Sequence, residues 1–351
     1  MSDPKRQLLD DRVLAWMRET RWEVDDERFG ALALDSFGFQ FEHCLPYRRF
    51  CEARGATPDS VGDWREVPAV PAGAFKEIAL RSFPAELTHH TFRTSGTAGL
   101  QRGELHLDTL SLYEASLLPP IRRFLFPDLA DGERCRIIVM TPSPEEAPDS
   151  SLSHMFGCML EALGTQDSGF CLKPIRLLEA ATEPLALCGT ALAFAHLLDS
   201  ASRLQLPTGS RVMETGGFKG HERKLSRDEL YASIGEKLGI PAARIVNQYG
   251  MTELGSQFYD SVLHEPERPR RKLAPPWARV RLVDPRTGRD AAPGEPGIIT
   301  IHDLANTGSV TAIQTADLGH TSEDDGFEIL GREPGAEERG CSIAADLMLG
   351  T

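Results

Sequence analysis

Thr94 to Gly99 form a run of small and hydroxyl residues, Thr-Ser-Gly-Thr-Ala-Gly, whose chemistry suits an anion. Gly96 and Gly99 allow positive φ angles, so backbone N–H groups can point at one centre, and the hydroxyls of Thr94, Ser95 and Thr97 add donors. The run lacks the Gly-Lys-Ser/Thr end of a P-loop, and no Gly-x-Gly-x-x-Gly follows a strand. It therefore predicts a polyphosphate-binding loop of another kind, with an ordinary turn as the alternative.

Three more motifs with chemically useful side chains follow along the chain. Residues 247–255 read Asn-Gln-Tyr-Gly-Met-Thr-Glu-Leu-Gly, Asp317 precedes Leu-Gly, and Gly331 precedes Arg332. Each motif alone has a plainer interpretation: Thr252 and Glu253 could begin a helix, and Asp317 and Arg332 could lie in turns. Their order after the first loop is what favours a shared function.

Together, the four motifs resemble those of the adenylate-forming superfamily of acyl- and aryl-acid ligases. Two flanking stretches, 70–77 (VPAGAFKE) and 216–220 (GGFKG), narrow the resemblance. They are similar to the acyl-protein synthetase family, the ATP-dependent component of the fatty-acid reductase of bacterial bioluminescence, with phenylacetate-CoA ligases as more distant cousins. The resemblance runs from about Phe50 to the C-terminus.

The resemblance implies a site for ATP and Mg²⁺. Thr252 would form a hydrogen bond with the α-phosphate and Glu253 would bind Mg²⁺, so both would be catalytic residues. The β- and γ-phosphates would be wrapped by the loop residues Thr94, Ser95, Gly96, Thr97 and Gly99. Phosphoryl and nucleotidyl transfer depend mainly on such positioning and charge neutralisation.

The same resemblance implies contacts to the nucleoside. Tyr249, followed by Gly250, would stack on adenine, and Asp317 would accept both ribose hydroxyls because a carboxylate can take two O–H donors at once. Arg332 would reach the ribose or the acyl phosphate. Gly216 and Gly217 would belong to a loop between the acyl pocket and the nucleotide.

The catalytic cation is the part that the resemblance leaves open. Full-length adenylate-forming ligases carry a C-terminal domain with a catalytic lysine, whereas here no lysine follows Lys272 and the chain ends about twenty residues after Arg332. We therefore expect that domain to be absent. Lys219 is the expected replacement, with Arg93, Lys76 or a partner protein as alternatives, and a surface position near a turn as its plainer interpretation.

Cys341, near the C-terminus, is a further catalytic candidate. In the bioluminescence synthetases a cysteine near the C-terminus takes the acyl group from the adenylate, and a thiolate is a suitable nucleophile for a mixed anhydride. Gly340 and Ser342 flank Cys341 after Pro334-Gly335, a sequence expected to let the tail swing. The alternative is a small apolar side chain that packs beneath its neighbours.

Strands and helices must alternate to position these residues. Short apolar runs predict buried strands at 136–140, 185–188, 211–214 and 244–248, and helical patterns lie at 5–19, 108–118, 152–163, 191–202 and 226–238. Pro119-Pro120 should end the second of these helices, and Ser226 with Glu229 fits a capping box at the start of the last. This order predicts an α/β fold with mixed or parallel sheets covered by helices, and ligands beyond the carboxyl ends of the strands. Alternation after Pro275-Pro276 predicts a small antiparallel β unit, which gives parts 1–275, 276–332 and a tail, 333–351.

The composition limits the remaining possibilities. The 351 residues carry a formal net charge of -14, which argues against a nucleic-acid or membrane surface. Seven scattered cysteines without a CxxC pair, and an N-terminus without a signal-peptide core, predict a cytoplasmic protein. His43 with Cys44 and Cys51, and His154 with Cys158, lack a four-ligand metal pattern, so core or surface positions are favoured.

The expected activity is ATP-dependent conversion of a carboxylic acid, a fatty acid by resemblance, to an acyl-adenylate. The acyl group would pass to a protein thiol, either the chain's own or that of a reductase or carrier partner. The alternatives are transfer to coenzyme A, a carrier protein or an amine, and a nucleotide-binding scaffold without turnover.

Overall fold

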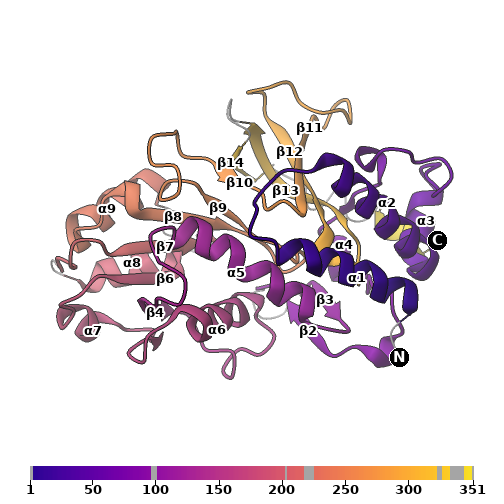
Figure 1. Ribbon diagram of the computed structural model, residues 1–351. Helices are drawn as coiled ribbons and strands as arrows, with labels where there is room; N and C mark the ends of the chain where they lie inside the picture. Colours follow the sequence, from indigo (N-terminus) through magenta and orange to yellow (C-terminus); the bar gives the residue numbers. More distant parts are fainter. Residues whose placement is uncertain are drawn as a thin grey trace. The chain divides into compact units, whose positions relative to one another are not determined.

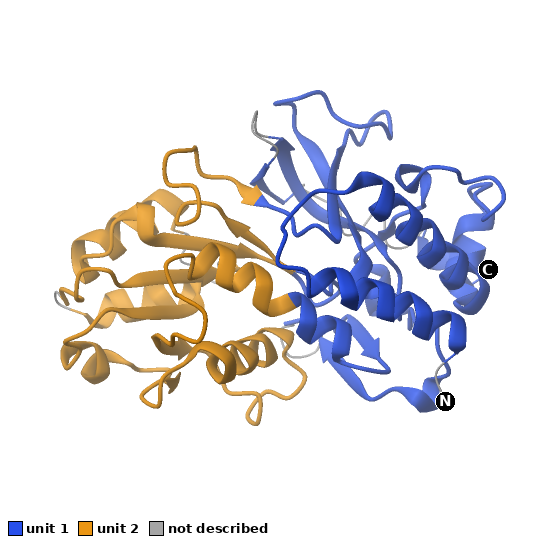
Figure 2. Ribbon diagram, viewed as in Figure 1, with its two compact units in different colours: residues 1–116, 251–256, 273–351 blue, residues 117–250, 257–272 orange. Residues whose placement is uncertain are grey.

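The computed structural model describes residues 3–95, 101–201, 204–216, 225–321, 326–332 and 344–349. By its contacts the chain divides into two compact units (Figure 2). Unit 1 comprises residues 1–116, 251–256 and 273–351, and unit 2 comprises residues 117–250 and 257–272. The tyrosine motif at 247–255 is thus shared between the units. The three-part division expected from the sequence stays a prediction.

Unit 2 contains a mainly parallel sheet in the order β5-β4-β6-β7-β8-β9. The four strands predicted from apolar runs are confirmed, and only β9 runs antiparallel to its neighbour, β8. The strands are β4 (Arg136–Met140), β5 (Gly169–Phe170), β6 (Leu185–Thr190), β7 (Arg211–Thr215), β8 (Ile245–Tyr249) and β9 (Phe258–Asp260).

Helices cover both faces of this sheet (Figure 1). On one face, α7 (Ile175–Glu179), α8 (Ala191–Ser200) and α9 (Arg227–Leu238) form a common core with β4, β6, β7 and β8. Figure 1 shows α5 (Ser111–Leu125) and α6 (Ser151–Leu163) in front of the sheet and α8 behind it. The capping box predicted at Ser226 and Glu229 is confirmed at the start of α9.

One predicted helix end was wrong. Pro119 and Pro120 were expected to end the helix that precedes them, but both lie inside α5, which continues to Leu125. Proline removes a helical hydrogen bond and crowds the preceding turn. Here Ile121 and Phe124, on the turn beyond the prolines, are fully buried, and burial of such side chains contributes about 2 kcal/mol each, enough to offset that cost.

Unit 1 begins with helices around an aromatic core. The predicted N-terminal helix is confirmed as α1 (Pro4–Met17), and it is followed by α2 (Asp26–His43) and α3 (Leu45–Glu52). Trp16, Phe29, Trp64 and Trp277 are buried in one cluster with leucines of α1 and α2. Shorter elements are η1 (Trp64–Glu66), α4 (Ala74–Glu77), η2 (Ala85–Leu87) and the hairpin β2 (His90–Arg93) and β3 (Glu104–Leu107).

The C-terminal part of unit 1 is the antiparallel structure expected after Pro276. Its strands pair in the order β11-β12-β13-β14, and β1 (Val70–Pro71) adds to β13 in parallel. They are β11 (Ala278–Val283), β12 (Gly297–Asp303), β13 (Ala312–Thr321) and β14 (Phe327–Arg332), while β10 (Lys272–Leu273) leads in from unit 2. The turn η4 (Leu304–Asn306) follows β12.

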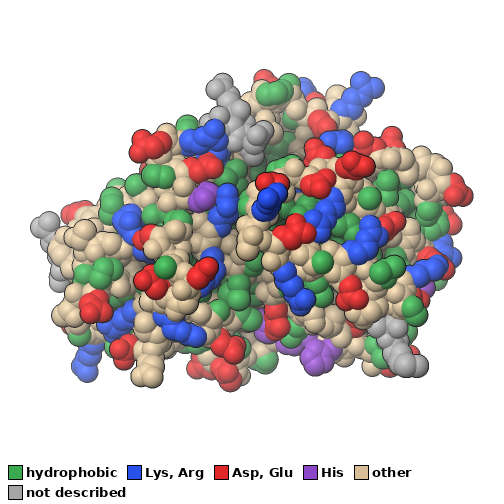
Figure 3. Space-filling view, in the orientation of Figure 1, with side chains coloured by type: hydrophobic (Ala, Val, Ile, Leu, Met, Phe, Trp, Pro, Cys, Tyr) green, Lys and Arg blue, Asp and Glu red, His purple; other side chains and the backbone are tan. Residues whose placement is uncertain are grey.

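Charged side chains of both signs are mixed over the face drawn in Figure 3. Many form exposed ion pairs within a unit, such as Arg12 with Asp35 at 2.6 Å and Arg28 with Glu19 at 2.7 Å. Pairs of this kind add little to stability because water screens them. In the described part of the chain, no helix is both long enough and apolar enough to cross a membrane.

Candidate functional site

The hairpin β2–β3 carries the predicted phosphate loop. At its base the Thr94 N–H donates to the Gly103 carbonyl at 2.9 Å, and the Gly103 N–H donates to Thr94 Oγ1 at 2.8 Å. Arg102 Nε also donates to the Thr94 carbonyl at 2.6 Å. Thr94 therefore closes the loop at its base, and Ser95, the next residue, is exposed. Gly96, Thr97 and Gly99 lie outside the described residues.

Glu253, the predicted metal ligand, lies beside this hairpin base. Its side chain is buried, with 5% of the residue exposed. A Cβ placed on Gly103 would lie 3.4 Å from Glu253 Oε1, 3.1 Å from Thr94 Cγ2 and 3.6 Å from the Cβ of Phe75. Phe75, Thr94 and Glu253, each from a stretch that the sequence singled out separately, thus approach one another within unit 1 around a glycine.

The segment after Glu253 is held by a buried carboxylate that the sequence analysis missed. Asp303, fully buried, accepts the N–H groups of Gly255 at 2.9 Å and Ser256 at 2.8 Å, and the Ser256 hydroxyl at 2.6 Å. Burial raises the pKa of Asp303, and these hydrogen bonds oppose the shift. Ala305 approaches so closely that a Cβ on Gly255 would lie 2.6 Å from its own Cβ, which explains the glycine.

Thr252 and Glu253 do not begin a helix, so the helix-capping alternative for Thr252 is wrong. The chain passes from β8 through turns to β9. Thr252 is partly buried, and the Glu253 carbonyl accepts Nδ2 of Asn306 at 2.7 Å. Asp303 directly precedes η4 and Asn306 is its last residue, so this one turn holds the part of the motif that belongs to unit 1.

Asp317 and Arg332, predicted from separate motifs, face each other on β13 and β14. They are direct partners in the strand register, and Arg332 Nε lies 3.6 Å from Asp317 Oδ1. The register shifts between Leu318 and Gly319. A Cβ on Gly319 would lie 2.5 Å from the Glu328 carbonyl oxygen, so only glycine fits there.

Unit 2 gathers its predicted residues at one edge of the sheet. The register pairs Thr190 with Thr215 and Thr215 with Gln248, so the carboxyl ends of β6, β7 and β8 lie together, as predicted. Gly216 follows β7 with a φ of 71°. Tyr249 is partly buried, its ring centroid 6.2 Å from that of Phe258. Gly250 ends the first segment of unit 2, so Tyr249 and Glu253 belong to different units.

Buried charges hold this edge. Glu214, which precedes Thr215 on β7, accepts the Tyr231 hydroxyl at 2.8 Å and Nδ2 of Asn247 at 2.6 Å. Burial raises the pKa of Glu214, and its hydrogen bonds oppose the shift. Lys272 Nζ donates to Asp260 Oδ1 at 2.8 Å and to the Asn247 carbonyl at 3.1 Å.

Asp260 receives a second cation, Arg270, which contacts its other oxygen. Burial would raise the pKa of Asp260, but Lys272 and Arg270 outweigh it and lower the pKa below the ordinary value. Burial lowers the pKa of Lys272, and Asp260 opposes that shift. Lys272, the last lysine of the chain, is therefore a buried structural cation of unit 2.

The other cations considered for catalysis differ in their surroundings. Arg93 pairs with Glu104 across the hairpin at 2.8 Å, and Lys76 is partly buried on α4. Lys219 and Gly217 lie outside the described residues. Their roles stay predictions.

The cysteines that the structure describes differ in how deeply their thiols are buried. Cys44, Cys51 and Cys188 are buried, and burial raises the pKa of each, that of Cys51 to about 12. Such thiols stay protonated and are poor nucleophiles. Cys341 lies outside the described residues, but residues 344–349, shortly after it, form a helical segment. Ala344, Ala345 and Met348 of that segment are buried.

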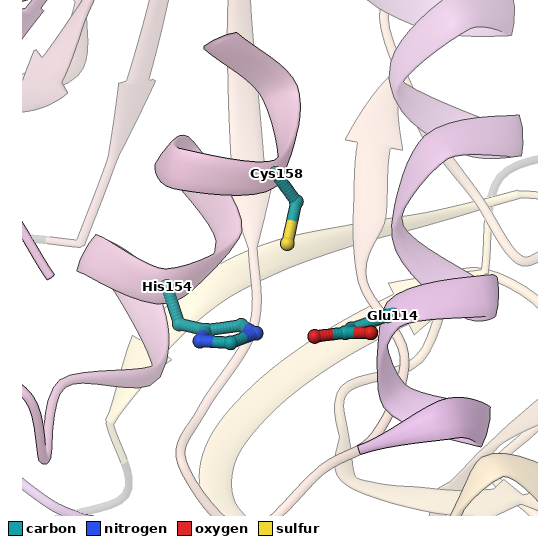
Figure 4. A group of neighbouring side chains, drawn as sticks. All are labelled: Glu114, His154 and Cys158. Carbon is teal, nitrogen blue, oxygen red and sulfur yellow. The ribbon is translucent and has the colours of Figure 1, made fainter. Parts of the chain in front are cut away.

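Neither cysteine and histidine pair forms a metal site by itself. Cys44 and Cys51 belong to the core, and the His43 ring stacks on Phe39 with centroids 4.2 Å apart. Figure 4 shows His154 and Cys158 on the same side of α6, one turn apart, and also draws Glu114, which belongs to unit 1. Two ligands from one helix are fewer than a structural zinc site uses. Phe194 and Leu198 of α8 are buried in the core.

Comparison with known proteins identifies the family. The sequence profile of the family described as acyl-protein synthetase, LuxE, matches residues 163–349, more than half of the chain. The chain belongs to the LuxE acyl-protein synthetase family. Two relatives carry the name long-chain-fatty-acid–luciferin-component ligase. The one from Vibrio harveyi is 22% identical over 92% of this chain and 89% of its own length. The one from Aliivibrio fischeri is 22% identical over 94% of this chain and 89% of its own.

Solved structures place the LuxE-family chain in the adenylate-forming fold. A 2-hydroxyisobutyryl-CoA ligase in complex with 2-HIB-AMP and CoA superposes with a TM-score of 0.64 and 16% identity, over 89% of this chain and 76% of that one. ATP-bound MatB from Rhodopseudomonas palustris gives 0.51 and 19%, over 80% of this chain. This chain spans about half of MatB, 56%.

These findings confirm the family and the fold class that the sequence predicted. The protein is an acyl-protein synthetase, a ligase of the AMP-forming type that activates a carboxylic acid and transfers the acyl group to a protein thiol. The assignment of individual residues to ATP, Mg²⁺ and the acyl group is a separate matter.

Proposed function

We propose that this LuxE-family protein uses ATP and Mg²⁺ to activate a long-chain fatty acid and then acylates its own Cys341. A carboxylate oxygen of the acid attacks the α-phosphorus of ATP, the bond to pyrophosphate breaks, and an acyl-adenylate forms. The thiolate then attacks the acyl carbon and AMP leaves. The acid class is supported by the names of the two relatives.

The main support for the ATP site is the position of Glu253. Its buried carboxylate oxygen would be 3.4 Å from a Cβ on Gly103, at the base of the loop that begins with Thr94 and Ser95. Carboxylate and hydroxyl oxygens are hard donors that Mg²⁺ prefers, and magnesium usually binds through one or two carboxylates together with phosphates. Mg²⁺ bound there would neutralise charge on the phosphates of ATP.

The other residues take the roles that their motifs carry in the family. Thr252 would donate to the α-phosphate and Tyr249 would stack on adenine. Asp317 would accept the ribose hydroxyls, and Arg332, its partner at 3.6 Å, would hold the Asp317 carboxylate in place or reach the acyl phosphate. The remaining contacts would come from Gly96, Thr97, Gly99, Gly216, Gly217 and Gly250.

Cys341 is favoured as acceptor over four other cysteines of the chain, whose thiols are weak nucleophiles. Burial raises the pKa of Cys44, Cys51, Cys135 and Cys188. A reducing cytoplasm, expected from the cysteine pattern, would keep the Cys341 thiol available. A partner reductase would then receive the acyl group.

ATP–pyrophosphate exchange over a panel of straight-chain and aromatic acids tests the first half of the proposal. We expect exchange that requires Mg²⁺ and is fastest with long-chain acids. Exchange with aromatic or short acids alone would overturn the proposed substrate, and tight ATP binding with no exchange would identify a scaffold without turnover.

Intact mass tests the acceptor. After incubation with ATP and the preferred acid, wild type should gain one acyl group, while Cys341→Ser should gain none. An equal adduct on both proteins would reject Cys341. AMP release that requires added coenzyme A would favour the CoA alternative.

A further inference from the structure

We propose that Asn306 is a positioning residue for the Glu253 carboxylate, and that the buried Arg6–Asp10 pair of α1 holds the turn that carries Asn306. The inference rests on the proposed function, since it explains how the proposed magnesium ligand is oriented. It assigns the N-terminal helix α1 a role in positioning the proposed metal ligand, in addition to its packing in the core.

The first step is the contact between Asn306 and Glu253. Asn306 is buried, with 1% exposed, and its Nδ2 donates to the Glu253 carbonyl at 2.7 Å. This bond fixes the backbone of Glu253, whose side chain points toward Gly103. Oδ1 of Asn306 has no hydrogen-bond partner among the described residues. A buried oxygen without a partner costs stability, so the benefit of an asparagine at this position lies in its Nδ2 bond to Glu253.

The second step is the support of the turn. Gln40 of α2 donates from Nε2 to the Asn306 carbonyl at 3.0 Å, and the Thr307 hydroxyl donates to Asp10 Oδ1 at 2.6 Å. The same Asp10 oxygen accepts Nε of Arg6 at 2.8 Å. All five side chains are buried, so these bonds are shielded from water.

The third step connects the turn to the phosphate-loop hairpin. Arg6 Nη2 lies 3.4 Å from Oδ1 of Asp108, the residue that follows β3. One ion pair therefore contacts both elements that bring Glu253 and Thr94 together. Gly308 leaves room for it, because a Cβ there would lie 2.9 Å from Arg6 Nη2.

A plain stabilising network would use the same contacts, so the test must measure the metal as well as stability. In Asn306→Ala, Glu253 keeps its chemistry but loses its orientation. We expect the Mg²⁺ concentration for half-maximal ATP–pyrophosphate exchange to rise about 10-fold or more, since partners that orient metal ligands typically contribute 10- to 100-fold. The KM for the fatty acid should stay unchanged.

Ser82→Ala is the matched control. Ser82 is also buried and donates to the same loop, to the Ser309 carbonyl at 3.0 Å, but it has no bond to Glu253. Both variants should lose thermal stability, and only Asn306→Ala should change the Mg²⁺ dependence. Thr307→Val, which breaks the bond to Asp10 and keeps Asn306, should give a smaller shift in the same direction and serves if Asn306→Ala does not fold.

Glu253→Gln separates this inference from the function on which it rests. If Glu253→Gln greatly weakens exchange while Asn306→Ala and Thr307→Val keep the wild-type Mg²⁺ dependence, positioning by Asn306 is rejected and the proposed site stands. If Glu253→Gln itself leaves the Mg²⁺ dependence unchanged, both are overturned. A shift in Ser82→Ala as large as in Asn306→Ala would reduce the network to a structural role.

Discussion

The two units hold their halves of the tyrosine motif in different ways. In unit 2, Asn247 at the start of the motif is fixed by the Lys272–Asp260 ion pair and by the buried carboxyl group of Glu214. In unit 1, the residues after Gly250 are held through their backbone, by Asp303 and Asn306, and by contacts too close for any residue but glycine. Charge pairs anchor a strand end strongly, whereas backbone bonds and close packing set the direction of one side chain. We therefore expect substitutions at Asp260 and Lys272 in unit 2 to affect mainly stability, and those around Glu253 in unit 1 to affect mainly catalysis.

The largest expected effect is that of Asp260→Ala. It would leave Lys272 buried without its carboxylate, and breaking a buried pair in this way costs about 3 to 5 kcal/mol. The free energy of unfolding in urea, measured at pH 7, checks this. As a control, Arg12→Ala breaks the exposed Arg12–Asp35 pair and should cost less than about 1 kcal/mol. Equal losses in the two variants would contradict the distinction between buried and exposed charges.

The pH dependence of the unfolding free energy of Asp260→Asn tests whether Asp260 is charged in the folded protein. Because the pKa of Asp260 is lowered in the folded protein, its charge stabilises the fold above the ordinary value of 3.8, and this contribution is lost as the pH falls through the lower folded pKa. The difference in unfolding free energy between wild type and Asp260→Asn should thus be full near pH 6 and shrink below about pH 4. A difference that is constant from pH 6 to pH 3 would argue against an ionised Asp260.

In unit 1 the corresponding test is Gly103→Ala. The added methyl group would lie 3.1 Å from Thr94 Cγ2, so Thr94 must give way, and it would also come into contact with Glu253 Oε1 at 3.4 Å. Overpacking of this kind costs about 1 to 3 kcal/mol, and we expect ATP–pyrophosphate exchange to fall by at least 10-fold. Gly62→Ala is the control, since a Cβ there meets no atom within 4 Å. If Gly103→Ala lowered stability but kept full exchange, Glu253 would not act from this position.

The sequence predicted the parts of the molecule that periodicity and local chemistry determine. Short apolar runs identified the strands 136–140 and 211–214, and the residue types of Ser226 and Glu229 identified the capping box of α9. The edge formed by Thr190, Thr215 and Tyr249 followed from the rule for parallel strands. The family was predicted from motif order.

What the sequence did not reveal depends on contacts between distant residues. Asp303 and Asn306, in Asp-Leu-Ala-Asn, look like surface turn residues, yet the former binds Gly255, 48 positions away. No periodicity encodes such a bond. The helix end predicted at Pro119 failed for a related reason, since burial of Ile121 and Phe124 outweighs the local preference. The one signal in the sequence was the position of Asp303, an aspartate directly after the apolar strand 297–302.

The smallest expected effect concerns the helical segment 344–349, which lies close in sequence to Cys341. Arg49 of α3 donates from Nη1 to the carbonyls of Met348 at 3.3 Å and Leu349 at 2.8 Å, as basic side chains do at helix C-termini. Arg49→Ala should therefore loosen this segment by about 1 kcal/mol, which corresponds to roughly five-fold faster hydrogen exchange of its amides.

The matched control is Arg48→Ala, the neighbouring arginine, which donates to the Phe41 carbonyl at 2.8 Å instead. It should leave hydrogen exchange in 344–349 unchanged. Because neither arginine belongs to the ATP site, ATP–pyrophosphate exchange should be normal in both variants. If the contact of Arg49 with this segment slows acyl transfer to Cys341, Arg49→Ala should acylate faster than wild type. Slower acylation would instead mean that the contact of Arg49 with this segment supports acyl transfer to Cys341, as Asn306 is proposed to support the action of Glu253.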